Sequence, residues 1–329
     1  MGKQASSLVL QVEGLAKRFA GGGGVDNVSM TIRGGEIAGF IGVNGAGKST
    51  TLRCILGLLR PDAGEVMLFG QPAGDETRRR IGFLPEERGL FSKERARDAI
   101  AFHARLKGMT RRAAYLAADR LLERIGLGGR KQARIGELSK GNAQRVQILC
   151  ALAHGPDLLI LDEPLSGLDP VAQSEVLSLF AEFRAGGGAI LFSTHSMAAA
   201  EALCDRVIIL GGGRTVFEGP LADASAETPH GAVVVTSDEA GLLAAAQAVG
   251  GEAHPMSSNM GEASRWRVVL PRQVTHPALM RALAERAVPI FAFEPIKPDL
   301  EAAFWTLAAP RPPPKAGDLA ETPRRSRAA

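Results

Sequence analysis

The sequence predicts an α/β fold whose core contains an inserted helical subdomain, followed by a second, smaller α/β domain. Over the first 220 residues, short β-rich runs alternate with helical patterns, as they do in layered α/β folds. Between about residues 92 and 154 the strands stop and three helical patterns follow one another. After Gly219 the composition becomes small and polar, and a second, shorter alternation begins.

Eight runs in the first part have the composition of strands and are expected to build its sheets: Ser7–Val12, Val28–Ile32, Glu36–Ile41, Val66–Phe69, Arg80–Leu84, Leu158–Leu161, Ala189–Ser193 and Arg206–Leu210. The helices of the inserted subdomain are expected at Lys93–Leu106, Arg111–Ile125 and Leu138–His154. The four consecutive glycines Gly21–Gly24 indicate a flexible hairpin loop.

Three regions are therefore predicted. The first domain spans residues 6–220, with its helical subdomain at about 92–154, and the small α/β domain spans 228–309. The last twenty residues, Pro310–Ala329, hold five prolines and an arginine cluster, a composition typical of disorder. A tether to acidic lipid head groups is the alternative for this tail.

Composition narrows the class of protein. Of the 329 residues, 45% are apolar, which is enough to build a buried core. The sequence contains no run of about 18 consecutive apolar residues, so no membrane span is predicted. Three separated cysteines without a C-x-x-C pair are expected to be core residues in a reducing compartment, and the N-terminus lacks the apolar core of a secretory signal. The net charge of +4 allows a nucleic-acid partner, but no segment has basic residues interleaved with aromatic ones, as single-strand binders do.

The first chemical motif follows the strand Glu36–Ile41 and opens a helix expected at Ser49–Leu59. It fits G-x-x-x-x-G-K-[ST], in which glycines let backbone amides close around phosphate oxygens at a helix N-terminus. Lys48 is predicted to meet the β- and γ-phosphates and Ser49 to bind Mg²⁺. The candidate nucleotide-binding residues of this loop are Gly42, Asn44, Gly45, Ala46, Gly47, Lys48, Ser49 and Thr50.

The second motif is an apolar strand, Leu158–Leu161, that ends in two adjacent acids, Asp162 and Glu163. Successive strand residues point to opposite sides, so the two carboxylates are expected to do different work. Asp162 is predicted to hold the Mg²⁺ shell, and Glu163 to polarise a water against the γ-phosphate.

Together these residues resemble the ATP-binding subunit of ABC transporters. Leu138-Ser139-Lys140-Gly141-Asn142 is similar to the signature motif of that family, with Lys140 and Asn142 in place of Gly and Gln. The resemblance implies that Ser139 and Gly141 bind ATP held by a second chain. Ser166–Asp169 resembles the loop that links the two active sites.

Three further residues are assigned by the same resemblance. His195, after the strand Ala189–Ser193, resembles the switch histidine that contacts the γ-phosphate. Phe19 stands where the family has an aromatic that stacks on adenine, although a core phenylalanine is the alternative. Glu86 occupies the place of the Q-loop glutamine and is a candidate Mg²⁺ ligand.

The resemblance covers about residues 6–220, and the small domain resembles the C-terminal extension of bacterial sodium-extrusion and drug- or antibiotic-export ATPases. It implies an ATP hydrolase that uses ATP and Mg²⁺, dimerises with an identical chain, and powers a separate membrane permease in export from the inner face of the cell membrane. A helix of that permease is expected to dock on Phe83, Leu84, Leu90 and Phe91.

Two other functions compete with this hypothesis. An ABC-type ATPase that acts on ribosomes or DNA is the alternative, but the chain has one phosphate loop and no sustained heptads, and no specific nucleic acid is expected. A regulatory module without catalysis would not need Lys48, Asp162, Glu163 and His195 together.

Overall fold

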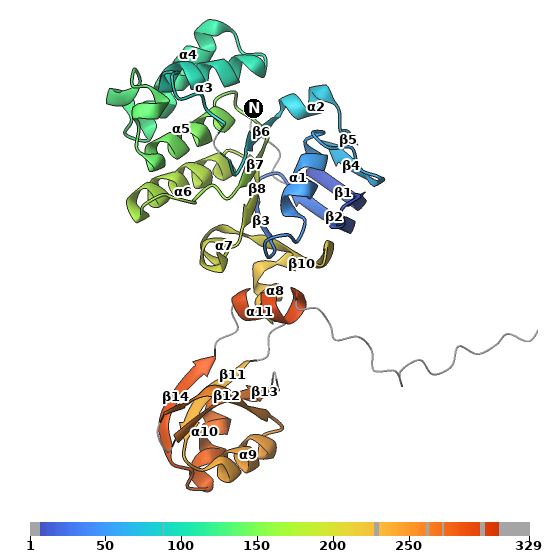
Figure 1. The fold of residues 1–329 in the computed structure, drawn as a ribbon, viewed down its shortest axis with the longest axis vertical. Coiled ribbons are helices and arrows are strands. Elements are labelled where there is room, and N and C mark those ends of the chain that lie inside the picture. Colours follow the sequence, from blue (N-terminus) through green and yellow to red (C-terminus); the bar gives the residue numbers. More distant parts are fainter. Residues whose placement is uncertain are drawn as a thin grey trace, which may run out of the picture.

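The computed structural model describes residues 7–87, 89–226, 230–260, 263–271, 273–296 and 300–308. Within these ranges the strands form three sheets, of which two share the large upper unit in Figure 1 and the third belongs to a separate small unit. The fold is the layered α/β arrangement that the sequence predicts.

The central sheet has six strands in the order β10-β9-β3-β8-β7-β6. Five run parallel, and the edge strand β10 pairs antiparallel with β9. Their bounds are β3 Ile37–Ile41, β6 Ile81–Leu84, β7 Leu158–Asp162, β8 Ala189–Thr194, β9 Arg206–Gly211 and β10 Arg214–Pro220. Because β3, β8 and β7 are neighbours and parallel, the loops after them open at one edge of the sheet, where ligands of such sheets bind.

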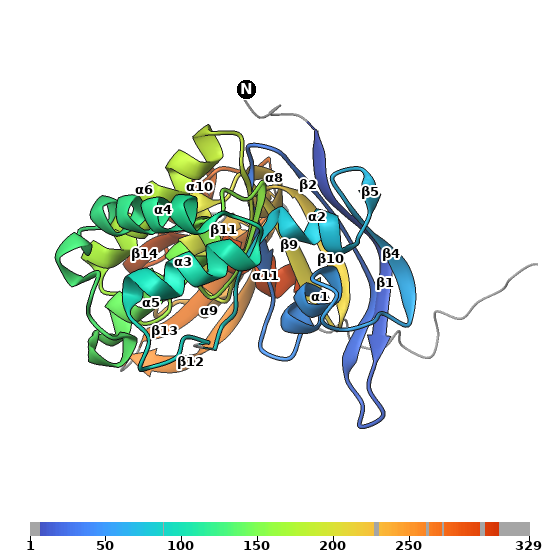
Figure 2. The same cartoon turned by 90° about the horizontal axis from the view of Figure 1, so that it is seen from above.

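One face of the central sheet carries a second, antiparallel sheet of order β2-β1-β4-β5 and the helices α1 and α2 (Figure 2). These elements are β1 Leu8–Arg18, β2 Gly24–Arg33, β4 Ala63–Leu68, β5 Gln71–Pro72, α1 Lys48–Ile55 and α2 Asp75–Arg79. Side chains of β3 alternate between the faces: Ala38 and Phe40 join this core, and Ile37 and Ile41 join the opposite one.

Helices cover the other face. They are α3 Ala96–Leu106, α4 Arg111–Arg124, α5 Lys140–Leu152, α6 Pro170–Ala185, α7 Met197–Leu203 and α8 Leu221–Ala226, with short 3₁₀ turns at Gly128–Arg130 and Ile135–Glu137. The three helices expected in the inserted subdomain are thus present as α3, α4 and α5. Ser139 caps α5 through its hydroxyl, and Asp169 caps α6 through its carboxylate.

The small unit has an antiparallel sheet of order β12-β13-β11-β14 and two helices. Its elements are β11 His230–Thr236, α9 Glu239–Ala248, β12 Glu252–Met260, β13 Ala263–Leu270, α10 His276–Glu285 and β14 Ile290–Ile296. Its own core joins Val234, Trp266 and Val268 of the sheet to Leu242 and Leu279 of the helices.

The last helix, α11 Leu300–Ala308, lies elsewhere than the sequence placed it. The sequence predicts that this helix belongs to the small domain at 228–309, but Leu300 and Phe304 are buried in the core of the large unit, with Ala224. The Leu300 amide donates to Glu201 Oε1 of α7 at 2.7 Å. The apolar pattern of a helix shows that one face is buried but does not show which unit it packs against, and this is why the sequence assigns α11 to the wrong unit.

Other parts of the sequence hypothesis have mixed outcomes. The sequence does not predict the strands β5, β10 and β12. The tail 310–329, for which it predicts disorder, lies outside the described residues. The remaining domain limits stay predictions.

Cys54, Cys150 and Cys204 are free and buried. Among the described helices, none has the length and apolar character needed to cross a bilayer.

Candidate functional site

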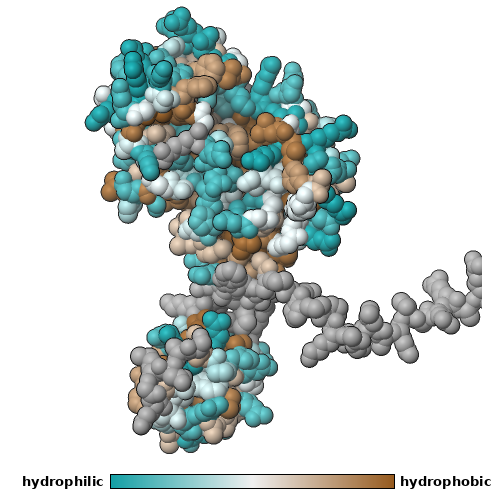
Figure 3. Space-filling view, in the orientation of Figure 1, coloured by the Kyte–Doolittle hydropathy of each residue, from teal (hydrophilic) through white to brown (hydrophobic). Residues whose placement is uncertain are grey.

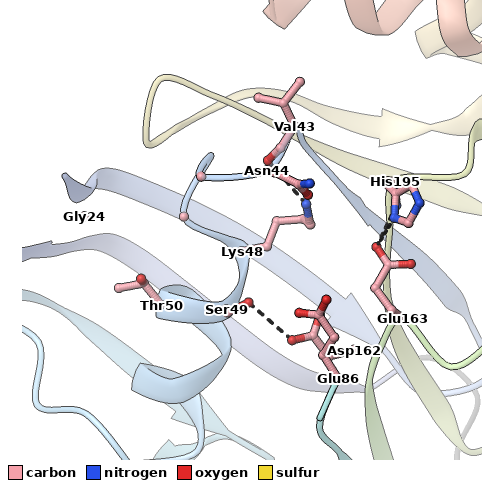
Figure 4. Close-up of a pocket in the computed structure, with 12 residues that line it drawn as sticks. Gly24, Val43, Asn44, Lys48, Ser49, Thr50, Glu86, Asp162, Glu163 and His195 are labelled. Carbon is pink, nitrogen blue, oxygen red and sulfur yellow. Dashed lines mark hydrogen bonds and ion pairs between the residues drawn. The ribbon is translucent and has the colours of Figure 1, made fainter. Parts of the chain in front are cut away.

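The loops after β3, β7 and β8 meet around a pocket of about 370 Å³ (Figure 4). Ten of the predicted site residues line it: Asn44, Gly45, Gly47, Lys48, Ser49, Thr50, Glu86, Asp162, Glu163 and His195. Residues more than a hundred positions apart in the sequence are therefore brought together by the order of the strands.

The loop between β3 and α1 depends on glycine. Gly47 precedes α1 with φ 101° and Gly45 has φ 81°, in the left-handed region that favours glycine. A Cβ added at Gly47 would lie 2.2 Å from Val25 Cγ1, so a larger residue would require Val25 to move. This backbone, together with the N-terminus of α1, is suited to binding phosphate oxygens.

Lys48 is the buried cation of the pocket. Its Nζ donates to the Gly42 carbonyl at 2.5 Å and to the Val43 carbonyl at 3.4 Å. Burial lowers the pKa of Lys48, and the charges of Glu163, Asp162 and Glu86 oppose this change. Its ammonium group is thus held at the phosphate loop by carbonyl oxygens and surrounded by carboxylates.

Ser49 and Asp162 form an oxygen-rich corner of the pocket. The Ser49 hydroxyl donates to Asp162 Oδ2 at 3.3 Å, and Glu86 lies beside this pair (Figure 4). In the part of the chain that the structure describes, no cluster of three or more His, Cys, Asp or Glu side chains has the geometry of a metal site. Hydroxyl and carboxylate oxygens nevertheless suit Mg²⁺, which takes few protein ligands and completes its shell with water and phosphate.

Glu163 is turned away from the line of β7. Its φ of 49° is uncommon for a residue other than glycine. The carboxylate reaches the end of β8, where Oε1 accepts from the His195 amide at 2.9 Å and lies 2.7 Å from His195 Nδ1. Oε2 accepts from the Thr194 hydroxyl at 3.4 Å. The carboxylate is therefore fixed at the pocket by the segment that carries His195.

Five predicted site residues do not line the pocket. Phe19 is 45% exposed in the loop between β1 and β2. Gly42 and Ala46 shape the phosphate loop from behind, since a Cβ at Gly42 would lie 3.0 Å from the Ala46 Cβ. Ser139 and Gly141 lie at the start of α5, where the Ser139 hydroxyl accepts from the Asn142 amide at 3.2 Å.

Sequence reasoning missed three residues of the site. Gly24 and Val43 line the pocket, and Thr194 contacts Glu163. The glycine run Gly21–Gly24, interpreted as a hairpin loop, does join β1 to β2. Gly24 is the last glycine of this run and begins β2 beside the phosphate loop. Val43 stood inside the quoted motif. Thr194 follows a predicted strand directly before His195, which is the signal that could have identified it.

A second pocket, here called the groove, has a volume of about 340 Å³. Its apolar residues are Leu56, Leu58, Phe83, Pro85, Leu90, Leu106, Cys150 and Ala151. Its nitrogen-bearing side chains are Arg78, His103, Lys107, Gln147 and His154. Of the four residues expected to receive a partner helix, Phe83 and Leu90 line the groove. Leu84 is fully buried in the core, and Phe91 is 74% exposed but does not line the groove.

The family described as ABC transporter matches residues 25–166 of the chain. The chain is 39% identical over 231 residues to the ABC transporter ATP-binding protein YhaQ of Bacillus subtilis, covering 70% of this chain and 78% of that protein. It is also 39% identical to the Nod factor export ATP-binding protein I of Burkholderia lata, over 62% of this chain and 68% of that protein. It is 38% identical to the methionine import ATP-binding protein MetN of Mesorhizobium japonicum, over 66% of this chain and 62% of that protein.

The fold is also similar to a solved structure described as the ATP-binding subunit of an ABC transporter. The TM-score is 0.62 at 34% identity, covering 67% of this chain and 92% of the other.

Proposed function

The chain belongs to the ABC transporter ATP-binding proteins, which hydrolyse ATP to power transport, and we propose that two copies of it close around two Mg²⁺·ATP to drive a separate membrane permease in export. The observation that carries the proposal is the meeting of Lys48, Asp162, Glu163 and His195 in one pocket, from three parallel strand ends.

Each group has a role that its position supports. Lys48 and the amides of residues 44–49 bind the phosphates, and Ser49 with Asp162 holds Mg²⁺, which would neutralise phosphate charge. Glu163 accepts hydrogen bonds from its neighbours and can in the same way orient a water toward the γ-phosphate. His195 contacts Glu163 through Nδ1, and its side chain is 68% exposed, so its Nε2 is the atom that would reach that phosphate.

A second copy would complete the site. Ser139 and Gly141 lie outside the pocket of their own chain, yet an N-capped helix start with free amides suits a phosphate. In the proposed dimer these residues face ATP bound at Lys48 of the other copy. Phe19, exposed on the loop before β2, would lie against adenine.

Mixed variants test the dimer. Lys48→Ala and Ser139→Arg should each be inactive alone, but their heterodimer keeps one intact composite site. An equal mixture should therefore recover up to about a quarter of the wild-type rate, since half the dimers are mixed and each has one site. Ser174→Arg, at an exposed position on α6, is the matched control and should stay active. A wild-type rate per chain that does not change with protein concentration would refute dimerisation.

The membrane partner is proposed to dock a cytoplasmic helix in the groove, as the family resemblance implies. The apolar wall formed by Leu56, Phe83 and Leu90 supplies the surface that such a helix needs. The chain would then act at the inner face of the membrane. Leu90→Asp should abolish co-purification of an integral membrane subunit encoded beside the gene, and recovery of ribosomes or DNA with the wild type instead would favour the alternative function.

Export is the proposed direction. The Burkholderia relative is named for export and the Mesorhizobium relative for import, so these two do not decide it. The support comes from the small C-terminal unit, which resembles the extension of bacterial export ATPases. ATP-driven accumulation of the substrate inside inside-out vesicles would support export, and its accumulation inside right-side-out vesicles would refute it.

A further inference from the structure

One buried hydroxyl beside the nucleotide pocket has no hydrogen-bond partner. Ser193 of β8 is 0% exposed, and no described residue hydrogen-bonds to its Oγ. Hydrophilic side chains cover much of the visible face of the large unit, where solvent can pair with them (Figure 3). Solvent does not reach Ser193, and a buried hydroxyl without a partner costs free energy, so such groups are rare in folded proteins. The hydroxyl is explained if its partner forms in another state of the site.

Two other buried hydroxyls near the pocket are paired. The Thr51 hydroxyl of α1 donates to the Gly47 carbonyl at 2.9 Å. The Thr194 hydroxyl, directly after Ser193 in β8, donates to Glu163 Oε2 at 3.4 Å. Unpaired hydroxyls are therefore not a general property of this part of the fold, and Ser193 needs an explanation of its own.

The strand register places Ser193 next to Asp162. The two residues are partners in the parallel pairing of β7 with β8. The strands stay together at this point, because the Glu163 amide donates to the Ser193 carbonyl at 3.0 Å. Neighbouring strands of a sheet lie about 4.8 Å apart, so side chains of paired residues are within reach of each other when they point to the same face.

Both side chains point to the face of the sheet that carries α1. Leu191 of β8 and Ile160 of β7 belong to the core on that face, and successive strand residues alternate between faces. Ser193 and Asp162 each stand two positions further along, so they point to this face as well. There Ser49 of α1 donates to Asp162 Oδ2 at 3.3 Å. The unpaired hydroxyl is thus the strand neighbour of the carboxylate to which the proposed function assigns Mg²⁺.

We propose that Ser193 is a positioning residue of the metal site: when Mg²⁺·ATP is bound, its hydroxyl donates to the Asp162 carboxylate and fixes the orientation in which this group holds Mg²⁺. Rotation about the Cα–Cβ bond of Ser193 moves the hydroxyl without a change in the backbone. A hydroxyl is neutral, so it orients the carboxylate without cancelling the negative charge that attracts a divalent cation. This inference rests on the proposed Mg²⁺·ATP site and adds the residue that orients its carboxylate.

The test measures binding of a non-hydrolysable ATP analogue to the full chain by calorimetry, once with saturating Mg²⁺ and once with EDTA. Ser193→Ala should raise the Kd about tenfold with Mg²⁺, as expected for loss of a hydrogen bond to a charged group, and leave the Kd in EDTA unchanged. Ser193→Thr keeps the hydroxyl and should bind as wild type does. Ile160→Val, which removes one methylene from the same face of β7, is the matched control. It should lower the thermal midpoint but leave the ratio of the two Kd values unchanged.

Two further measurements separate positioning from packing. Because the hydroxyl is unpaired without nucleotide, Ser193→Ala should not lower the thermal midpoint of the ligand-free chain. Asp162→Asn should weaken Mg²⁺-dependent binding, and adding Ser193→Ala to it should cause no further loss. A wild-type ratio of Kd values in Ser193→Ala, a lowered midpoint of this variant without ligand, or additive losses in the double variant would overturn the inference and leave the proposed function intact. If wild-type chain binds the analogue equally with and without Mg²⁺, the proposed metal site itself fails.

Discussion

Protonation of His154 should destabilise the fold at mildly acidic pH. Burial lowers the pKa of this imidazole from 6.5 to about 4 in the folded chain. Because the folded state binds the proton less readily than the unfolded state, the contribution of His154 to stability is fully present above pH 6.5. It is lost as the pH falls from 6.5 toward 4.

The size of the effect follows from the same difference. At about 1.4 kcal/mol per pH unit, the lowered pKa corresponds to about 3 kcal/mol. His154 is partly exposed, so solvent screening reduces the expected loss to about 2 kcal/mol. The substitution His154→Gln removes the titrating group and should flatten this part of the pH dependence.

Urea unfolding at several pH values between 7.5 and 4.5 measures the effect as the difference between wild type and His154→Gln. This comparison cancels the carboxylates that titrate in both proteins. His254→Gln, at an exposed position of β12, is the matched control and should follow wild type. If the stability curves of wild type and His154→Gln run parallel through this range, burial does not depress the pKa of His154 and the reasoning is refuted.

Three further predictions concern the nucleotide pocket. Glu163→Gln should keep ATP binding but lower turnover by about a hundredfold or more, as expected for loss of a positioned base, and full turnover would contradict that role. Glu86→Gln removes a negative charge near the phosphates and should shift the Mg²⁺ dependence of hydrolysis, so identical Mg²⁺ titrations would place Glu86 outside the metal's reach. Gly47→Ala should lower the thermal midpoint and weaken ATP binding, because a Cβ there meets Val25 at 2.2 Å and φ is 101°. Gly129→Ala, with open space around it, should change neither, and equal behaviour of the two variants would refute the steric argument.

The sequence predicted the phosphate loop and the acid pair because each is a contiguous pattern with its own chemistry. Lys48 and Ser49 follow one strand, and Asp162 and Glu163 end another, so the pocket required only that the two strands be near neighbours. The position of Thr194 directly before His195 marks it as a residue near the site, but its contact with Glu163 is seen only in the structure, where Glu163 has a positive φ.

The groove was harder to predict because several segments that are separate in the sequence form it. Leu56 follows α1, Arg78 lies in the last turn of α2, His103 lies on α3 and His154 follows α5. Only the packing of these helices brings the side chains together. Phe91 was expected there because it is apolar and near Leu90, but adjacent residues need not face the same surface. The sequence could suggest an apolar docking surface, whereas the cations and imidazoles that line the same groove come together only in three dimensions.

The position of α11 makes the small unit an insertion between two elements of the large core. The chain leaves that core after α8 and returns to it at α11, and Ala224 of α8 shares a core cluster with Leu300 and Phe304 of α11. The exit and entry points are therefore adjacent, an arrangement in which a folded unit can be inserted without disturbing its host. Since Leu300 also hydrogen-bonds to Glu201 of α7, the helix that follows His195 is part of the same contact. The helix α11 thus stabilises the large unit through a contact with α7, which follows the pocket residue His195 in the sequence. A small domain joined to the large unit at one end only would not provide this contact.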